Sequence, residues 1–315
     1  MSRPLRVEYP GACYHVTTRG NGRQAIFTCA EDGARFLALF GREAAQQRWL
    51  CHGWCLMETH YHLLVETPEA NLGRGMGRLN MAYSQWFGRQ HGRPGHLFGG
   101  RYKAILFEKA LWLAPLARHV VLNPVRAGLV RRADQWHWSS HRALMTGEAP
   151  EWFAAGAFLA PFGAPAERAR AAWSAYVAAG VNAPAPWDDL RGGHYLGGPD
   201  FLRATADRIR GRPLDQVSRR EAAPDRPTPD DVLAAVARAA RVPLARTLDR
   251  KRAPEAWRVA VYLLRRACNL PLNETAAMAG VSPGRISQIQ RAIEDAGGLA
   301  RSFAWAQPLE TLMRG

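Results

Sequence analysis

The sequence has little lysine, no cysteine framework and no long apolar run. Lysine occurs only at Lys103, Lys109 and Lys251, although the chain holds 42 basic residues. The five cysteines are odd in number and irregularly spaced, which excludes a disulfide framework and favours a reducing, cytoplasmic compartment. No run of about 18 apolar residues occurs and the N-terminus lacks an apolar signal core, so we expect neither a membrane span nor a secretion signal.

Acidic residues are also scarce, so positive charge dominates the chain. The 27 acidic residues against 42 basic ones give a net charge of +15. Nearly all of the positive charge is arginine, whose planar guanidinium suits phosphate better than a point charge does. A soluble protein this basic typically binds nucleic acid, and we predict that partner here. The alternative is a genome-wide arginine bias displayed on a solvated surface.

Residue periodicity predicts the order β-α-β-β-α-β in the first half of the chain, followed by one more helix. The predicted strands are Ala12–Gly20, Trp49–Met57, His60–Thr67 and Arg101–Lys109. The predicted helices are Ala30–Arg48, Asn71–Gly92 and Leu111–Asn123. This order is typical of an α+β, ferredoxin-like fold, which packs its helices on one face of the sheet and leaves the other face for ligands. The second half of the chain is predicted to be mostly helical.

Two histidines in one predicted strand form a candidate metal site. His60 and His62 are two residues apart, so their side chains point to the same face of the sheet. Neutral imidazoles bind divalent metals well, although structural or surface histidines would have the same spacing. His119 and Asn123 are four apart and share a helical face. The Asn123 carbonyl oxygen can supply a third ligand, and Pro124 should hold Asn123 out of the helical region.

The segment "LNETAAMAGVSPGRISQIQRAIED" predicts a helix-turn-helix. Gly280 suits the end of a first helix, Ser282 the N-cap of a second, and Pro283 its first position. The isoleucines of the second helix should face the core, at Ile286, Ile289 and Ile293. Its polar side chains are left to bind DNA, at Arg285, Ser287, Gln288 and Arg291. An ordinary helical hairpin is the alternative.

Three segments resemble the single-tyrosine HUH transposases, and most closely the branch associated with repetitive extragenic palindromes (REP). They are "CLMETHYHLLVETPEANLGRGM", "GHLFGGRYKAIL" and "ARHVVLNPVRAGLV". The resemblance implies a ferredoxin-like fold and cleavage of single-stranded DNA beside hairpins, with a tyrosine as nucleophile. It also implies Mg²⁺ or Mn²⁺ held by His60, His62 and Asn123.

The resemblance, together with the composition of the middle of the chain, predicts a division into domains. Residues 1–148 would form the transposase-like nuclease domain, and residues 149–227 a partly helical connector. Residues 228–297 would form a duplex-binding helix-turn-helix domain, which resembles that of the bacterial replication initiator, and residues 298–315 a tail. The implied protein is cytoplasmic, bacterial and associated with the nucleoid. It would bind hairpin or single-stranded DNA through the first domain and duplex through the last, as a monomer or a homodimer.

Basic residues near both motifs are the candidate DNA contacts. In the N-terminal domain they are Arg101, Lys103 and Arg126. In the C-terminal domain a basic cluster precedes the predicted helix Pro254–Cys268, and it comprises Arg250, Lys251 and Arg252.

One position departs from the family pattern. The family's tyrosine lies four residues before the third ligand, and this chain has His119 there. Cleavage could be lost, leaving a DNA-binding regulator. His119 could instead act as nucleophile or general base, or another tyrosine such as Tyr102 could substitute. Tyr102 could also stack on a base. A metal-dependent hydrolase unrelated to DNA is a further alternative, which the charge disfavours.

Overall fold

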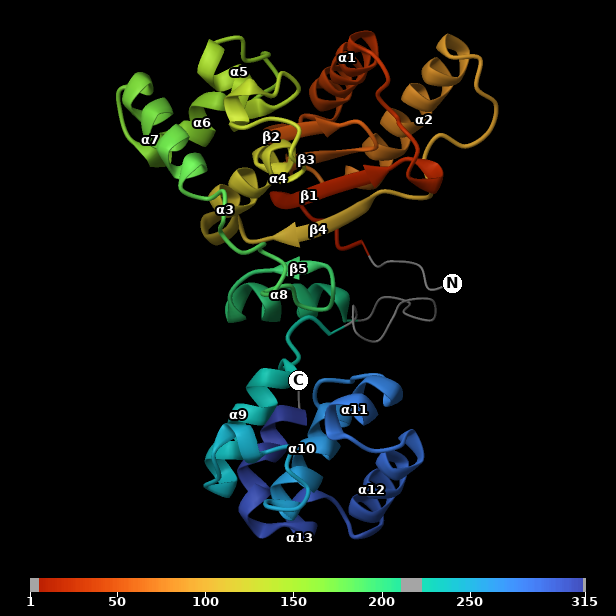
Figure 1. Ribbon diagram of the computed structural model, residues 1–315, viewed down its shortest axis with the longest axis vertical. Helices are drawn as coiled ribbons and strands as arrows, with labels where there is room; N and C mark the ends of the chain where they lie inside the picture. The colour runs from red at the N-terminus through yellow and green to blue at the C-terminus, as the bar shows by residue number, and fades with distance from the viewer. Residues whose placement is uncertain (1–5, 211–222, 314–315) are drawn as a thin grey trace. The chain divides into compact units, whose positions relative to one another are not determined.

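The computed structural model describes residues 6–210 and 223–313, and they form two compact units (Figure 1). One unit is Arg6–Phe201, and the other lies within Leu202–Gly315. Residues 211–222, which belong to the predicted connector, lie outside the described residues. No helix of the described residues is long and apolar enough to cross a membrane.

A five-stranded sheet forms the centre of the first unit. Its strands are β1 (Ala12–Arg19), β2 (Leu50–Met57), β3 (His60–Thr67), β4 (Lys103–Phe107) and β5 (Tyr195–Leu196). The spatial order is β2-β3-β1-β4-β5. The first four strands pair antiparallel, and β5 pairs parallel to β4. The predicted ferredoxin-like order is therefore confirmed, and β5 is an addition that the periodicity did not predict.

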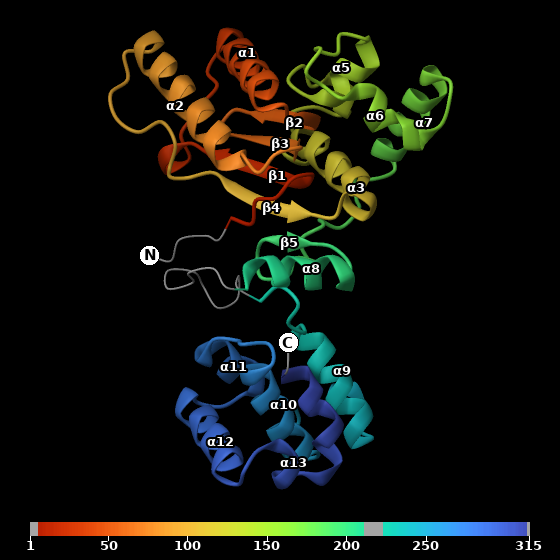
Figure 2. The ribbon, with the colours of Figure 1, turned by 180° about the vertical axis from the view of Figure 1, so that it is seen from behind.

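Two long helices cover one face of this sheet, α1 (Ala30–Gln47) and α2 (Leu72–Gln90) (Figures 1 and 2). Phe36 of α1 is fully buried, and its ring lies 4.5 Å from that of Tyr61 and 5.2 Å from that of Tyr83. Tyr61 belongs to β3, so this aromatic cluster joins both helices to the sheet. Burial of such rings contributes much of the core energy of a small domain.

Helices α3 (Lys109–Val121) and α4 (Asn123–Arg126) follow β4, and α3 packs against β2 and β3. The two helices are separated at Leu122. Asn123 begins the second helix, so the prediction that Pro124 holds Asn123 out of the helical region is wrong. Proline is tolerated in a first helical turn because the N–H that it lacks has no helical partner there.

Shorter helices complete the first unit. They are α5 (Ser140–Thr146), α6 (Ala155–Leu159) and α7 (Ala166–Ala178). Ser140 ties α5 to β2, because its hydroxyl accepts a hydrogen bond from the Trp54 backbone N–H at 3.1 Å. Helix α8 (Pro199–Ile209) follows β5, and its residues from Leu202 on belong to the second unit.

The second unit contains helices around one apolar core. They are α9 (Pro229–Ala240), α10 (Pro254–Arg266), α11 (Leu272–Ala279), α12 (Pro283–Asp295) and α13 (Leu299–Ser302). The turn between α11 and α12 has the predicted chemistry: Gly280 is left-handed at φ 64°, and Ser282 caps α12 by accepting from the Arg285 N–H. The three isoleucines of α12 are buried, as predicted: Ile286, Ile289 and Ile293.

Candidate nucleic-acid interface and metal centre

Strand register assembles basic and imidazole side chains on the sheet face opposite α1 and α2. Thr17 of β1 pairs with His62 on one side and with Lys103 on the other. Directly paired residues of antiparallel strands project to the same face. We call the face that carries His15, His60, His62 and Lys103 the histidine face. Arg19 pairs with His60 and belongs to it as well.

His62 and His15 form a buried imidazole pair. His62 Nδ1 lies 3.0 Å from His15 Nε2, and the rings are nearly parallel with centroids 5.2 Å apart. The buried Nε2 of His62 has no hydrogen-bond partner among the described residues. If His62 Nδ1–H donates to His15, the Nε2 lone pair is free. A ligand histidine ordinarily shows this arrangement, in which the second nitrogen donates to a supporting group.

His60 provides a second imidazole beside His62. The two ring centroids are 5.0 Å apart, and the planes meet at 78°. His60 Nδ1 lies 3.1 Å from the Thr59 hydroxyl, which leaves Nε2 for another ligand. This pair therefore fits a divalent metal, with the buried unpartnered nitrogen of His62 as the observation that favours it.

Burial keeps these imidazoles neutral at pH 7. It lowers the pKa of His15 to about 3, with His119 and then Lys103 adding to the effect, and that of His60 to about 4, with Arg19 adding to it. The pKa of His62 falls well below its ordinary value, first through burial and then through the neighbouring histidines. A neutral imidazole retains the lone pair that a metal requires. Arg19 and Lys103 are exposed cations of the same face, so an anionic ligand would meet positive charge there.

His119 of α3 lies next to this group, but its ring is held by an arginine. The Arg126 guanidinium donates from Nη1 to His119 Nδ1 at 2.8 Å. Burial, and then Arg126, lower the pKa of His119 to about 4. A neutral ring that accepts at Nδ1 carries its proton on Nε2. The Nε2 nitrogen of His119 is therefore a hydrogen-bond donor and not a nucleophile.

Trp187 packs against His119. Its ring lies 4.8 Å from His119, edge to face, and 5.4 Å from His15, nearly stacked. Arg126 also donates from Nη2 to the carbonyls of Gly180 and Ala183, at 3.1 and 3.0 Å. Arg126 was predicted to contact DNA, but in this structure it binds the segment that leads to Trp187.

Asn123 uses its amide nitrogen locally. Its Nδ2 donates to the carbonyls of His119 and Val120 at 2.9 and 3.1 Å. The side-chain oxygen of Asn123 is left as the atom that could meet a metal, as the third-ligand prediction requires.

Tyr102 lies on the other face of the sheet. Because Lys103 shares the histidine face, strand alternation turns Tyr102 towards α2, where its hydroxyl lies near Gly73. Burial raises the pKa of Tyr102 to about 12, and the Arg6 guanidinium lies 3.7 Å above its ring. The structure does not support Tyr102 as the substitute nucleophile, and Arg6 already occupies one ring face that a base would need.

Tyr102 and Arg101 line a groove of about 810 Å³ between α2 and residues 95–102. Arg101 is exposed at its edge, so the predicted DNA contact remains accessible. The two residues that follow Arg101 therefore serve different surfaces, Tyr102 the groove and Lys103 the histidine face.

Two residues of the histidine face, and Trp187 beside it, were missed by sequence reasoning. His15 and Arg19 stand at alternate positions of a predicted strand, which is a signal that they share a face. Nothing local reveals that this face is the one that carries His60. Trp187 had no signal at all, since it is remote in the sequence from every motif.

The candidate duplex-binding side chains of the second unit are at its surface. Arg285, Gln288 and Arg291 are exposed on α12, and Ser287 is half-buried. Arg285 donates to the Gln288 side-chain oxygen at 3.0 Å. The basic cluster before α10 is exposed throughout, at Arg250, Lys251 and Arg252. Asp249 orders this cluster by accepting from two of its backbone N–H groups.

Comparison with known families bears on the first unit. Residues 9–114 match the family model described as IS200-like transposase. This segment is therefore similar to that family, and the match does not extend over the rest of the chain. A solved structure of a REP-associated tyrosine transposase bound to a REP hairpin shares 18% identity with this chain, with a TM-score of 0.40. The match covers 49% of this chain and 92% of that one. No curated protein matches.

The matched residues contain β1 to β4, His15, His60 and His62. They end before His119 and Asn123 and do not include the second unit.

Proposed function

We propose that this protein is a DNA-binding relative of the IS200-like transposases that holds a divalent metal and a DNA end but has lost tyrosine cleavage. One observation carries the proposal. At the position of the family's nucleophile stands His119, whose Nδ1 accepts from Arg126 at 2.8 Å and whose ring packs on Trp187. We therefore favour a domesticated DNA-binding regulator that no longer cleaves DNA over an enzyme that carries out metal-dependent strand transfer.

The metal proposal depends on the imidazoles of β3. His60 and His62 would hold Mg²⁺ or Mn²⁺ through Nε2 atoms, with the Asn123 side-chain oxygen as third ligand. Bound there, the ion would neutralise charge on a phosphate oxygen. His15 would hold the His62 ring through the 3.0 Å contact at Nδ1. Imidazole is an unusual main ligand for Mg²⁺, and Mn²⁺ suits this donor set better.

DNA binding at the same face would use side chains that surround the imidazoles. Arg19 and Lys103 would contact backbone phosphates, and His119 Nε2–H would donate to a phosphate oxygen. A phosphate donor leaves the backbone intact, whereas a nucleophile would need an unprotonated nitrogen facing the phosphorus. The tautomer of His119 therefore favours DNA binding without cleavage.

A hairpin-cleavage assay tests the loss of the nucleophile. A labelled pool of single-stranded hairpins with randomised flanks is incubated with Mn²⁺ and the native chain, with His119→Tyr, or with His119→Tyr combined with Trp187→Ala. The second substitution makes room, because a phenol is longer than an imidazole. We expect all three proteins to bind the hairpins, and only the combined His119→Tyr, Trp187→Ala variant to give a covalent protein–DNA band on a denaturing gel. A covalent band from the native chain would refute the proposal.

Metal titration tests the site itself. By calorimetry, the His60→Ala, His62→Ala double variant should lose Mn²⁺ binding, whereas the exposed His96→Ala control should retain it. Equal Mn²⁺ affinity in the native chain and the double variant would exclude the histidine site.

We propose further that α11 and α12 form a helix-turn-helix that binds duplex DNA. The exposed Arg285 and Gln288 of α12 are side chains that pair well with guanine and adenine edges. Arg250, Lys251 and Arg252 would contact the backbone. Affinity for duplex should then fall with salt, with a log–log slope of roughly −0.9 for each phosphate neutralised. A flat salt response would argue against a DNA role for this unit.

Arg285→Ala tests direct readout. If Arg285 contacts a base edge, this substitution should reduce the binding free energy for the preferred duplex by about 1–3 kcal/mol. Lys251→Ala should instead weaken all duplexes alike, since a phosphate contact carries no sequence information. Similar behaviour of the two variants on all sequences would leave the unit as a non-specific tether.

A further inference from the structure

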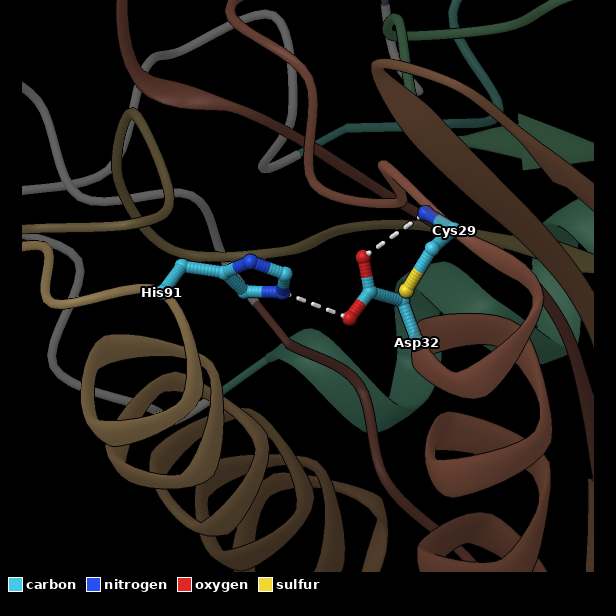
Figure 3. A group of neighbouring side chains, drawn as sticks. All are labelled: Cys29, Asp32 and His91. Carbon is cyan, nitrogen blue, oxygen red and sulfur yellow. Dashed lines mark hydrogen bonds and ion pairs between the residues drawn. The ribbon is translucent and has the colours of Figure 1, made fainter.

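A second group of metal-ligating side chains lies away from the histidine face, between the ends of α1 and α2. Cys29 precedes α1, Asp32 lies in its first turn, and His91 follows α2. One ligand atom from each lies within 4.8 Å of the other two. Figure 3 shows Asp32 between the two other side chains. Cys29 and His91 are exposed, and Asp32 is fully buried.

The two oxygens of Asp32 have different partners. Oδ2 accepts from the Thr28 N–H and hydroxyl at 2.6 and 2.7 Å and from the Cys29 N–H at 3.2 Å. Oδ1 accepts from His91 Nε2 at 2.8 Å, a bond that an arriving metal would have to replace. Burial alone would raise the pKa of Asp32, but the bonds from His91, Thr28 and Cys29 outweigh it and lower the pKa. Asp32 is therefore an ionised ligand at pH 7.

We propose that Cys29, Asp32 and His91 form a binding site for a borderline divalent transition metal such as Zn²⁺, distinct from the histidine face. A thiolate, a carboxylate oxygen and an imidazole nitrogen are all zinc ligands, and a water completes a tetrahedral set. The thiolate distinguishes this site from one for Mg²⁺, which prefers oxygen. The bound metal would link the first turn of α1 to the end of α2.

Protons must leave for the metal to enter. Cys29 Sγ–H loses its proton to solvent as the Sγ–metal bond forms. His91 stops donating to Asp32 and ligates through Nε2, with its proton on Nδ1. Zinc binding should thus release one proton from the thiol and tighten as pH rises.

The competing explanation is that the group is only a helix cap. Asp32 satisfies backbone donors at the start of α1, as capping residues do, and His91 would then simply anchor it. Cobalt distinguishes the two explanations, because a thiolate ligand gives Co²⁺ a charge-transfer absorption in the near ultraviolet that oxygen and nitrogen ligands do not. The four other cysteines are buried, so a band from the folded protein would report Cys29.

The experiment uses the full chain, freed of metal by a chelator and kept reduced with a phosphine. Co²⁺ is titrated first, and Zn²⁺ is then added to displace it. We expect a charge-transfer band in the native chain, and we expect Zn²⁺ to abolish it. The band should be missing in Cys29→Ser. In His91→Ala the apparent affinity for Co²⁺ should be roughly tenfold lower or more. The exposed His96→Ala control and the His60→Ala, His62→Ala double variant should both keep the band.

These variants separate this site from the proposed function. Asp32 is left intact so that the α1 cap, and with it the fold, is preserved. No band in the native chain, or an undiminished band in Cys29→Ser, would overturn the proposal and leave the group as a helix cap. Loss of the band in the His60→Ala, His62→Ala double variant would also overturn it, because the cobalt would then be at the histidine face.

Discussion

The buried imidazole of His15 should make the first unit sensitive to acid. Burial lowers the pKa of His15 to about 3, against about 6.5 in an unfolded chain. Between these values the unfolded chain binds a proton that the folded protein excludes. Stability should therefore be complete above about pH 6.5 and fall as the pH is lowered through this window.

The magnitude follows from the two pKa values. At pH 5 the folded His15 is still neutral, while its unfolded pKa lies about 1.5 units above the solution pH. Each unit is worth about 1.4 kcal/mol, so lowering the pH from 7.5 to 5 should remove about 2 kcal/mol through His15 alone. This figure counts His15 only, since the other histidines of the face add to the acid sensitivity separately.

His15→Phe removes the titrating group and keeps a flat ring against His62 and Trp187. It also breaks the 3.0 Å contact with His62, which should cost about 1–3 kcal/mol at every pH. The diagnostic quantity is the change in unfolding free energy between pH 7.5 and pH 5. That change should be smaller by about 2 kcal/mol in the variant than in the native chain.

Urea unfolding followed by tryptophan fluorescence measures this difference with a chelator present. Nine of the eleven tryptophans lie in Arg6–Phe201, so the signal reports mainly this unit. The exposed His96→Phe serves as the matched control and should retain the native pH dependence. An identical pH dependence in His15→Phe and the native chain would refute the reasoning, because His15 would then ionise alike in both states.

Two further predictions concern the stability of the two units, one for each unit. Phe36→Ala should destabilise the first unit by about 3–5 kcal/mol, because it empties a fully buried ring site between Tyr61 and Tyr83; urea unfolding by tryptophan fluorescence measures this. Ser282→Ala should cost the second unit about 1 kcal/mol by removing the cap of α12, which hydrogen exchange along that helix would detect. A loss of stability confined to the second unit in Phe36→Ala, or to the first unit in Ser282→Ala, would contradict the corresponding prediction.

Local signals explain why most of the fold could be predicted. Strand alternation depends on neighbouring residues alone, so the four main strands and the common face of His60 and His62 follow from the sequence. The turn at Gly280 and Ser282 is equally local, because each residue satisfies a backbone requirement at its own position. These elements formed at nearly the predicted bounds.

Non-local pairing explains what was missed. β5 is only two residues long, and it exists as a strand because Tyr195 and Leu196 pair with Leu106 and Phe107 of β4. A two-residue segment has no periodicity from which a strand could be inferred. The same limit applies to His15: its strand is recognisable, but its position beside His62 depends on which strands are neighbours and in which register.

The chemistry of position 119 shows the same limit most clearly. The sequence reveals that a tyrosine is missing, and leaves histidine free to be a nucleophile, a base or neither. Arg126, one helix later, decides the proton position, and Trp187, 68 residues away, covers the ring. Restoring a tyrosine alone would put a longer side chain against that indole. Arg126 would still point its guanidinium at the side chain of residue 119. The neighbours of His119 are thus matched to an imidazole, which is why recovery of cleavage should require Trp187→Ala as well as His119→Tyr.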